Sequence, residues 1–395
     1  MEKIRLGDAF SFIRNGANIK QGVKDGGYPI TRIETISDRA VNREKMGYAG
    51  ITDVSKYDDY ILQDGDILMS HINSEKHLGK TAIYKKQKDE KIIHGMNLLC
   101  LRPDNSQILP EYAFYFLSSN DFLRQIPNIT KKSVNQASFT VTALKKLSFA
   151  KRGIDEQKKI VCELDKVTVL TDKRKKQLEK LDELVKSRFI EMFGTLNANE
   201  KGFDVIDIEK LCTLIKDGTH QTPTYTEDKQ NGFKFLSSKD VMTQKICWED
   251  IKYIPAELHE KLYATIQPKR NDILMSKNGV NYGVAAVNDT DEVFDIYVSL
   301  ALLRPKTDRV NPVYLRCAIN NPDTKRQFDS SIKGIGVPNL HLGEIKKTKV
   351  LLPPISKQNE FTDFVEQVDK SKFEIKQSLE KLELLKKALM QKYFG

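Results

Sequence analysis

The sequence predicts an α+β protein in which two tandem globular domains are each followed by a long α-helix, with the two helices packed as an antiparallel coiled coil. Three observations support this prediction. The chain is an internal duplication, each copy ends in a segment with an apolar period of about 3.5 residues, and the rest of each copy consists of short β-rich runs separated by turns. The predicted boundaries are residues 1–153 and 195–354 for the domains and residues 154–194 and 355–395 for the helices. Such a chain is expected to have pseudo-two-fold symmetry.

The duplication is visible when the sequence is aligned with itself at a shift of about 201 to 206 residues. The sequence Asp-Ile-Leu-Met-Ser at residues 66–70 recurs at residues 272–276, and Leu-Arg-Pro at residues 101–103 recurs at residues 303–305. Leu-Glu-Lys-Leu occurs in both copies, and each copy ends on Phe-Gly. Ordered matches at nearly one spacing indicate two copies of one fold.

The C-terminal part of each copy carries seam residues spaced alternately by four and three positions. This period is typical of a coiled-coil seam rather than of a helix that lies on a globular core. Polar seam positions, namely Thr171, Arg174, Lys372 and Lys386, lower stability but can fix the register. A first helix of about 38 residues, or roughly 57 Å, would set the two domains at opposite ends of a rod. The apolar seam residues are Ile160, Leu164, Val167, Leu178, Leu181, Val185, Phe361, Val365, Val368, Ile375, Leu379, Leu382 and Leu389.

The globular part of each copy has the pattern of an α+β domain. Residues 66–69 and 82–84 are short β-rich runs, and clusters of Gly, Asn and Pro separate such runs from one another. A helix is expected after each Leu-Arg-Pro, for instance over residues 111–117.

Composition and charge indicate a folded and mildly basic protein. Lys and Arg number 64 against 54 Asp and Glu, and the net charge of +10 favours an anionic partner such as nucleic acid. The five cysteines are far apart and form no Cys-x-x-Cys pair, so neither a disulfide framework nor a zinc site is expected. The sequence has no signal-peptide core and no apolar stretch of about 20 residues, so we expect a cytoplasmic protein.

Several short motifs occur together in this chain. They are the two Asp-Ile-Leu-Met-Ser runs, the two Leu-Arg-Pro sequences, the two Leu-Glu-Lys-Leu helices, and Asp217-Gly218-Thr219-His220 followed by Thr222-Pro223. With these motifs the whole chain resembles the specificity subunits of type I restriction-modification systems. The resemblance implies that the globular parts are target-recognition domains, which read a bipartite double-stranded DNA site, and that the helices are spacers.

The resemblance also implies partners and cofactors. Two methyltransferase (modification) subunits and restriction or translocase subunits are expected to bind the shared frame. No cofactor is expected on this chain, whereas S-adenosylmethionine, ATP and Mg are expected on the partner subunits.

The loops that differ between the copies are the candidates for DNA contact. The first copy has Asn-Gly-Ala-Asn at residues 15–18, where the second has Asp-Gly-Thr-His at residues 217–220, as expected if the halves read different sequences. Loops after each Met-Ser run and later loops at matching places hold Lys, Asn and Gly, which can reach phosphates or base edges. The candidate residues are Asn18, Lys20, His71, Asn73, Lys76, Lys80, Lys131, Lys132, Asn135, Gln136, Thr219, His220, Gln221, Lys277, Asn278, Asn281, Lys333 and Asn339.

Two other functions are compatible with parts of the pattern. A scaffold could use the coiled coil to join two protein-binding domains. A metal-dependent nuclease could use Pro322-Asp323 with Glu344-Ile345-Lys346, but the first copy has Asn120-Asp121 and Ala143-Leu144-Lys145 there, so the carboxylate pair is not shared. No Asn-Pro-Pro-Tyr or Asp-Pro-Pro-Tyr motif of adenine methylation and no Gly-rich cofactor loop is present. We therefore predict a specificity subunit with no catalytic residue and no metal site.

Overall fold

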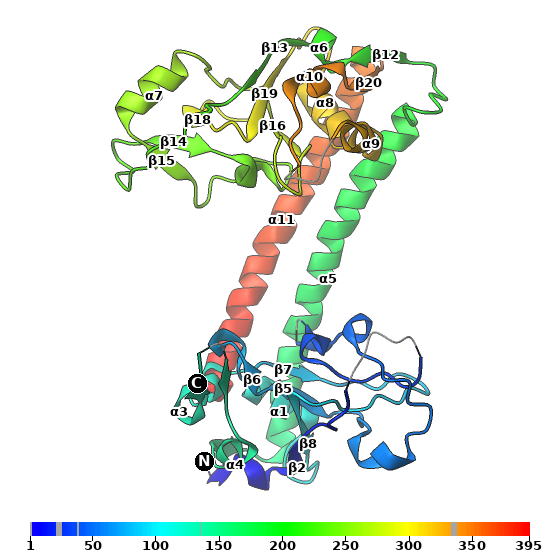
Figure 1. Ribbon diagram of the computed structural model, residues 1–395, viewed down its shortest axis with the longest axis vertical. Helices are drawn as coiled ribbons and strands as arrows, with labels where there is room; N and C mark the ends of the chain where they lie inside the picture. Colours follow the sequence, from blue (N-terminus) through cyan, green and yellow to red (C-terminus); the bar gives the residue numbers. More distant parts are fainter. Residues whose placement is uncertain (1, 21–25, 38, 135, 333–337) are drawn as a thin grey trace. The chain divides into compact units, whose positions relative to one another are not determined.

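The computed structural model describes residues 2–20, 26–37, 39–134, 136–332 and 338–395 (Figure 1). The chain divides into two compact units. Unit 1 consists of Met1–Lys175 and Lys376–Gly395, and unit 2 consists of Lys176–Ile375. Each unit therefore contains one mixed α/β domain, the beginning of one long helix and the end of the other.

The sheet at the centre of unit 1 has six strands in the order β2, β8, β5, β7, β4, β3. Strand β5 lies inside the sheet and is buried at all four positions, which explains its continuous apolar sequence. Helix α1, Pro110–Leu117, begins with proline at its first turn, where the missing N–H costs no hydrogen bond. The strands are β2 (Phe10–Asn15), β3 (Ile36–Ser37), β4 (Ala40–Val41), β5 (Ile67–Ser70), β7 (Thr81–Ile83) and β8 (Leu98–Pro103).

Unit 2 repeats the central part of this sheet. Its four strands have the order β13, β19, β16, β17, which matches β2, β8, β5, β7 in unit 1. The strands are β13 (Cys212–Asp217), β16 (Ile273–Ser276), β17 (Ala285–Val287) and β19 (Leu300–Pro305). The duplication in the sequence is therefore a duplication of the fold, and the α+β prediction is confirmed.

Smaller elements complete each unit. In unit 1, β1 (Glu2–Arg5) pairs with β11 (Ser148–Lys151), and in unit 2, β12 (Asp204–Asp207) pairs with β20 (Lys349–Leu352). Unit 2 has a second sheet of β15 (Lys252–Ile254), β14 (Phe233–Leu236) and β18 (Phe294–Ile296). The short helices are α2 (Asn120–Leu123), α3 (Ile126–Ile129), α4 (Val141–Lys145), α6 (Ile208–Leu211), α7 (Ala256–Tyr263), α8 (Pro312–Ile319), α9 (Pro322–Ser331) and α10 (Leu342–Lys347).

The two most repeated motifs are joined by the same ion pair in both units. Arg102 of Leu-Arg-Pro donates to both carboxylate oxygens of Asp66, from Nε at 2.8 Å and from Nη2 at 2.7 Å, and Asp66 is 1% exposed. Arg304 binds Asp272 in unit 2 with the same two distances. A buried carboxylate requires such a bidentate partner. These motifs therefore recur because they hold neighbouring strands together.

The long helices are α5, Ile154–Phe193, and α11, Ile355–Phe394, with 40 residues each. Every seam position that the sequence predicts is buried or half-buried. In unit 2 the helices run antiparallel, because Lys372 binds Asp182 at 2.5 Å while Phe361 packs on Phe189 at 5.4 Å between ring centroids. The predicted seam and its antiparallel direction are confirmed. Within the described residues no helix is both long enough and apolar enough to cross a membrane.

Each domain holds the start of its own helix by a buried glutamine. Gln157 Oε1 accepts from Leu109 N at 2.9 Å, and its Nε2 donates to Gln107 O and Arg152 O. Gln358 makes the same kind of contacts in unit 2, accepting from Asn311 N at 2.8 Å. Both side chains are fully buried, so the direction in which each helix leaves its domain is fixed.

The end of each helix is seated in the core of the domain of the other copy. Phe394 of α11 packs on Tyr112 of unit 1 with a centroid distance of 5.2 Å, and Phe193 of α5 packs on Tyr314 of unit 2 at 4.9 Å. This exchange explains the Phe-Gly repeat at the ends of the copies. The linear domain boundaries predicted from the sequence stay a prediction, because the compact units combine segments that are not contiguous.

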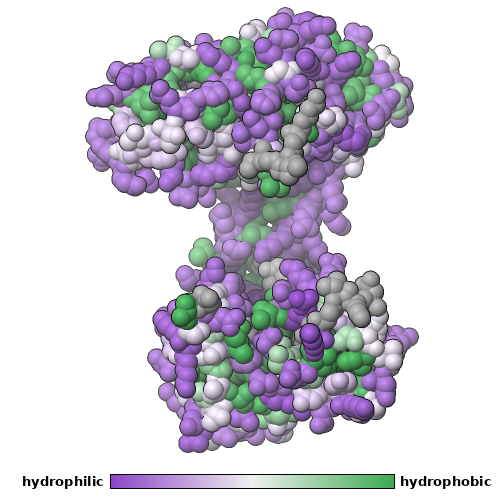
Figure 2. Space-filling model, in the orientation of Figure 1, coloured by the Kyte–Doolittle hydropathy of each residue, from purple (hydrophilic) through white to green (hydrophobic). Residues whose placement is uncertain are grey.

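Apolar side chains are concentrated in the interior of the units. The two largest core clusters join the sheet, the helix after Leu-Arg-Pro and the ends of both long helices. On the face that Figure 2 shows, hydrophilic residues prevail in each unit and apolar residues are scattered among them. Scattered apolar residues are normal for a protein surface, so the loops that differ between the units are more informative.

Candidate nucleic-acid interface

The first candidate loop of each unit begins with a glycine that no other residue could replace without a shift of the backbone. A Cβ atom on Gly16 would lie 2.1 Å from Gly95 O, and one on Gly218 would lie 2.2 Å from Ile296 O. The following residue forms a parallel bridge in both units, Ala17 with Gly95 and Thr219 with Tyr297. The backbone of this glycine and of the residue after it is therefore paired in the same way in both copies, whereas the side chains around it differ.

In unit 2 the loop after β16 pairs with the late loop. Leu340 N donates to Lys277 O at 2.9 Å, Gly279 N donates to Pro338 O at 3.1 Å, and Asn278 bridges to Asn339. Two segments about sixty residues apart in the sequence thus form one edge of the unit.

Unit 1 has the same pairing. Phe139 N donates to His71 O at 3.1 Å, which corresponds to the contact between Leu340 and Lys277. Beside it, β6 (Ile72–Asn73), β10 (Ala137–Ser138) and β9 (Lys131–Lys132) form a three-stranded sheet. The structure therefore brings together His71, Asn73, Lys131 and Lys132, which the sequence predicted separately.

A buried ion pair ties the first loop of unit 2 to this edge. Lys277 Nζ lies 2.5 Å from Asp217 Oδ1, with the two side chains 6% and 19% exposed. His220 Nε2 lies 3.7 Å from Asp217 Oδ2. Lys277 is therefore engaged inside the unit, where it orients two loops at once.

Unit 1 carries neutral side chains at the corresponding positions, Asn15 and His71. His71 is buried, and this burial lowers its pKa to about 4, so its imidazole is neutral near pH 7. Burial also lowers the pKa of the nearby His94, to about 3. The two units thus present different hydrogen-bonding groups on equivalent frames.

Some polar atoms at these edges are buried without a hydrogen-bond partner among the described residues. They include His71 Nδ1 in unit 1 and Asn278 Oδ1 in unit 2. Buried polar atoms in native proteins almost always have a partner, so an unpaired one needs an explanation. Both atoms have almost no accessible surface, so they lie inside the loop edges rather than on them.

The other candidates vary in exposure. Asn135 and Lys333 lie outside the described residues. Lys132 forms an ion pair with Glu75 at 2.8 Å, in which both side chains are largely exposed. Asn73, Thr219 and Asn278 are half-buried, and the exposed candidates are Asn18, Lys20, Lys76, Lys80, Lys131, Lys132, Gln136, His220, Gln221, Asn281 and Asn339. Their role in DNA contact stays a prediction.

Two exposed valines at the loops were missed by the sequence analysis. Val134 is 99% exposed and Val280 is 87% exposed, each within a candidate loop. The search considered polar residue types, although apolar side chains also read DNA through the thymine methyl group or by wedging between base steps. A valine placed among Ser, Asn and Gly turn residues was the available signal.

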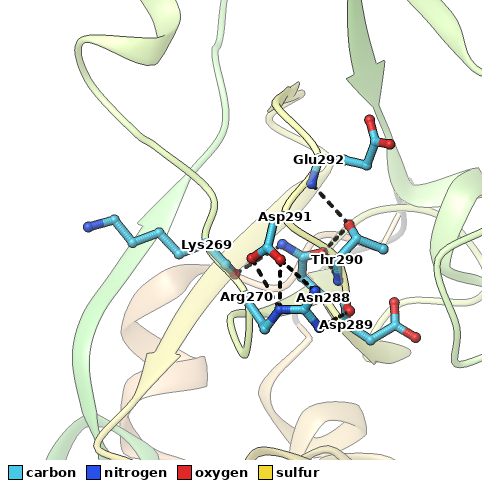
Figure 3. Close-up of polar contacts among 7 residues, drawn as sticks. All are labelled: Lys269, Arg270, Asn288, Asp289, Thr290, Asp291 and Glu292. Carbon is cyan, nitrogen blue, oxygen red and sulfur yellow. Dashed lines mark hydrogen bonds and ion pairs between the residues drawn. The ribbon is translucent and has the colours of Figure 1, made fainter.

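The opposite end of the β16–β17 hairpin has a network of hydrogen bonds and ion pairs (Figure 3). Asp291 accepts from Arg270 Nε at 3.1 Å and from Nη2 at 2.6 Å, and Arg270 Nη1 donates to Asp289 O. Arg270 thereby lowers the pKa of the Asp291 carboxyl. Glu292 is paired with Lys234. The charged groups at this end of the hairpin are therefore engaged mainly with one another.

The residues of the alternative nuclease pattern serve structural contacts. Asp323 accepts from Leu196 N at 2.6 Å and pairs with Arg326, so it fastens the segment after α5 to α9. Lys346 pairs with Glu209 at 3.3 Å. This geometry favours a structural role for both residues.

The repeated frame carries two loop edges with different side chains, and their polar and basic residues are typical of the class of DNA-binding proteins. Comparison with known proteins agrees with this class. The family model described as the type I restriction modification DNA specificity domain matches residues 1–181 and 200–386. The chain belongs to the family of type I restriction-modification specificity subunits, which recognise DNA sequence.

Individual relatives support the same assignment. The chain is 30% identical to a protein of Methanocaldococcus jannaschii named as the MjaX type I restriction enzyme specificity subunit, over 98% of this chain and 90% of the relative. It is 25% identical to the EcoKI specificity subunit of Escherichia coli over 178 residues, which are 45% of this chain and 38% of the relative. The crystal structure of the S subunit from M. genitalium has a TM-score of 0.58 at 15% identity and covers 100% of this chain and 96% of its own, which shows a shared fold.

Proposed function

We propose that this chain selects a bipartite double-stranded DNA site, reads one half with each unit, and directs partner subunits to that site without catalysing a reaction itself. The single observation that carries the proposal is the pair of loop edges, which have the same backbone pairing in both units but different side chains. The buried pair of Asp217 and Lys277 in unit 2 stands where unit 1 has Asn15 and His71. Because the two edges carry different side chains on the same frame, we expect the two units to read different half-sites.

The partners in this proposal are two methyltransferase subunits and restriction or translocase subunits. S-adenosylmethionine, ATP and Mg would be bound by those partners, and this chain would bind no cofactor. The proposal also places the protein in the cytoplasm, where such a complex meets the chromosome.

The experiment that tests the proposal is a map of adenine methylation in the host genome with and without this gene. We expect one split sequence motif to lose its methylation when the gene is deleted and to regain it when the gene is restored. Unchanged methylation, together with binding of purified protein to partner proteins but not to DNA at low salt, would favour the scaffold function instead.

A neighbouring pair of loop lysines offers a test of the DNA-binding edge of unit 1. We expect Lys131→Gln with Lys132→Gln to reduce the slope of log affinity against log salt concentration by about 2, because each lysine–phosphate contact contributes about 0.9. Both lysines are exposed, so stability should change little. The measurement is DNA binding by fluorescence anisotropy at several salt concentrations.

The same unit supplies the matched control. Lys145 and Lys146 are also adjacent and exposed, but they lie on α4 and at its end rather than in the paired loops. Their double replacement by Gln should leave the slope unchanged. Equal effects of the two double variants would mean that the lysines act through net charge alone.

The docking of two methyltransferase subunits is supported by one exposed apolar position that the repeat preserves. Leu184 on α5 is 46% exposed, and Leu385, its counterpart on α11, is 47% exposed. Two like subunits would bind two like surfaces. We expect Leu184→Asp or Leu385→Asp alone to reduce the number of bound methyltransferase subunits from two to one, and the double variant to bind none, as measured by native mass spectrometry.

The neighbouring position provides the control for this prediction. Leu384 is 67% exposed, but the first copy has Glu183 at its counterpart, so the repeat does not preserve it. Leu384→Glu should leave both subunits bound. Retention of two subunits by the Leu184→Asp, Leu385→Asp double variant would show that this position is not part of the dock.

A further inference from the structure

A cavity in unit 1 is lined by three cationic side chains, by Glu383 and by Gly395. Its volume is about 280 Å³, and its lining includes Arg39, Ser118, Asn120, Glu383, Lys386 and Lys387. The lysines belong to the last turns of α11, near the point marked C in Figure 1. Three cations from two separate segments thus meet around one space large enough for a small anion.

The cations of this cavity have no ion-pair partner among the described residues. No carboxylate of that part of the chain lies within 4.0 Å of the charged nitrogens of Arg39, Lys386 or Lys387, although Glu383 lines the same cavity. The Arg39 guanidinium lies instead over the Phe114 ring, 5.4 Å from its centroid. Burial and, next, the charge of Arg39 lower the pKa of Lys386, while Asp165 and Asp172 act in the opposite direction.

In the corresponding cavity of unit 2, two of the four cationic side chains are paired with carboxylates. Lys372 binds Asp182 at 2.5 Å, and Lys245 binds Asp369 at 3.0 Å. The repeat places Thr168 and Thr171 in unit 1 where unit 2 has Asp369 and Lys372. Asp369, which pairs with a lysine in unit 2, is therefore replaced by a hydroxyl in unit 1, whereas Asp182 corresponds to Glu383.

The backbone conformation at one wall of each cavity also shows that the two cavities correspond. Arg39 and its counterpart Gln244 both have positive φ, 67° and 61°. A backbone hydrogen bond spans each of them in the same pattern, since Asn42 N donates to Thr35 O and Cys247 N donates to Asp240 O. The same turn thus carries an arginine in one unit and a neutral amide in the other.

We propose that this unit 1 cavity binds a phosphate group through Arg39, Lys386 and Lys387. The guanidinium offers paired donors that match phosphate oxygens, and the two ammonium groups add charge. Ser118 and Asn120 supply further polar groups at the wall. The phosphate belongs either to the DNA backbone, in which case the inference rests on the proposed function, or to a free phosphate compound.

The test uses the full chain and a variant that installs the residues of unit 2. Arg39→Gln with Lys386→Val gives the cavity the amide and the valine that Gln244 and Val185 provide there, so the fold should tolerate both. Lys387→Gln is a second variant at an exposed position. Each protein is titrated with inorganic phosphate against a chloride control of equal ionic strength, and its salt slope for binding duplex DNA is measured.

The outcomes separate the two sources. If the phosphate is free, inorganic phosphate raises the Tm of the wild type and not of the variants, and the salt slope for DNA stays the same. If it belongs to DNA, the slope falls by about 2 in the double variant and by about 1 in Lys387→Gln, because each lost contact contributes about 0.9. No phosphate effect and an unchanged slope would overturn the inference while leaving the proposed function intact. A wild-type protein that binds no DNA would refute the proposed function. The phosphate titration alone would then show whether the cavity binds phosphate.

Discussion

Replacement of Asp217 by Asn is expected to abolish the reading of one half-site and to lower the free energy of unfolding by about 3 kcal/mol. The reason is that Lys277, only 6% exposed, would lose its carboxylate partner and become a buried unpaired ammonium. The loop at residues 217–221 and the hairpin after β16 would then no longer be fixed to each other. Chemical denaturation gives the change in stability, and methylation mapping gives the change in the half-site.

A second variant separates the loss of the fold from the loss of recognition. Asp217→Asn with Lys277→His installs the neutral pair that unit 1 carries as Asn15 and His71, and so removes the buried charge. We expect this double variant to recover most of the stability but to read an altered second half-site, with the first half-site unchanged. Recovery of the original half-site would show that the pair only supports the fold.

An exposed ion pair in the same unit provides the control. Arg270 and Asp291 are bound to each other, but their side chains are 50% and 76% exposed. Exposed pairs contribute between zero and about 1 kcal/mol. Asp291→Asn should therefore change neither stability nor the half-site to a comparable extent, and an effect as large as that of Asp217→Asn would argue against burial as the cause.

The helices and the duplicated fold of this protein were predictable because the sequence patterns that indicate them are local or repeated. The seam from Ile160 onward follows a period set by helix geometry alone, and every position of it is buried or half-buried. The repeated Asp66 and Arg102 motifs indicated a shared fold, although their reason, a buried bidentate ion pair, depends on strand pairing that no pattern encodes. The repeated motifs therefore identified the residues that both units use to stabilise their shared fold.

The site was less predictable because its properties arise between distant segments. In the sequence, Lys277 is a loop lysine of the kind that contacts phosphate. In the structure it is buried and paired with Asp217, sixty residues earlier in the chain, so it positions the loops instead. His71 is a polar loop residue in the sequence, yet burial makes it a neutral imidazole. The residues that differ between the copies indicate where the two units would read different half-sites. The burial of each residue determines whether it can contact DNA or only position a loop.

The length of the long helices leads to the last prediction, a change in the gap between the half-sites. Helix α5 has 40 residues without a break, which corresponds to about 60 Å at 1.5 Å per residue. We expect four residues inserted after Lys175, matched by four just before Lys376, to lengthen the unread gap by one or two base pairs and to leave both half-sites unchanged. These points lie at the boundaries of the two compact units, so the contacts inside each unit are preserved.

Two physical quantities set the size of this effect. Four helical residues add about 6 Å, close to two base pairs at 3.4 Å each, and they add little more than one full turn, so the seam nearly keeps its register. Exchange of residues 1–150 with those of another family member should have the converse effect and change one half-site while the gap stays the same. Methylation maps of both variants decide the matter. An altered half-site in the insertion variant, or an unchanged gap with full activity, would show that the helices do not measure the distance between the half-sites.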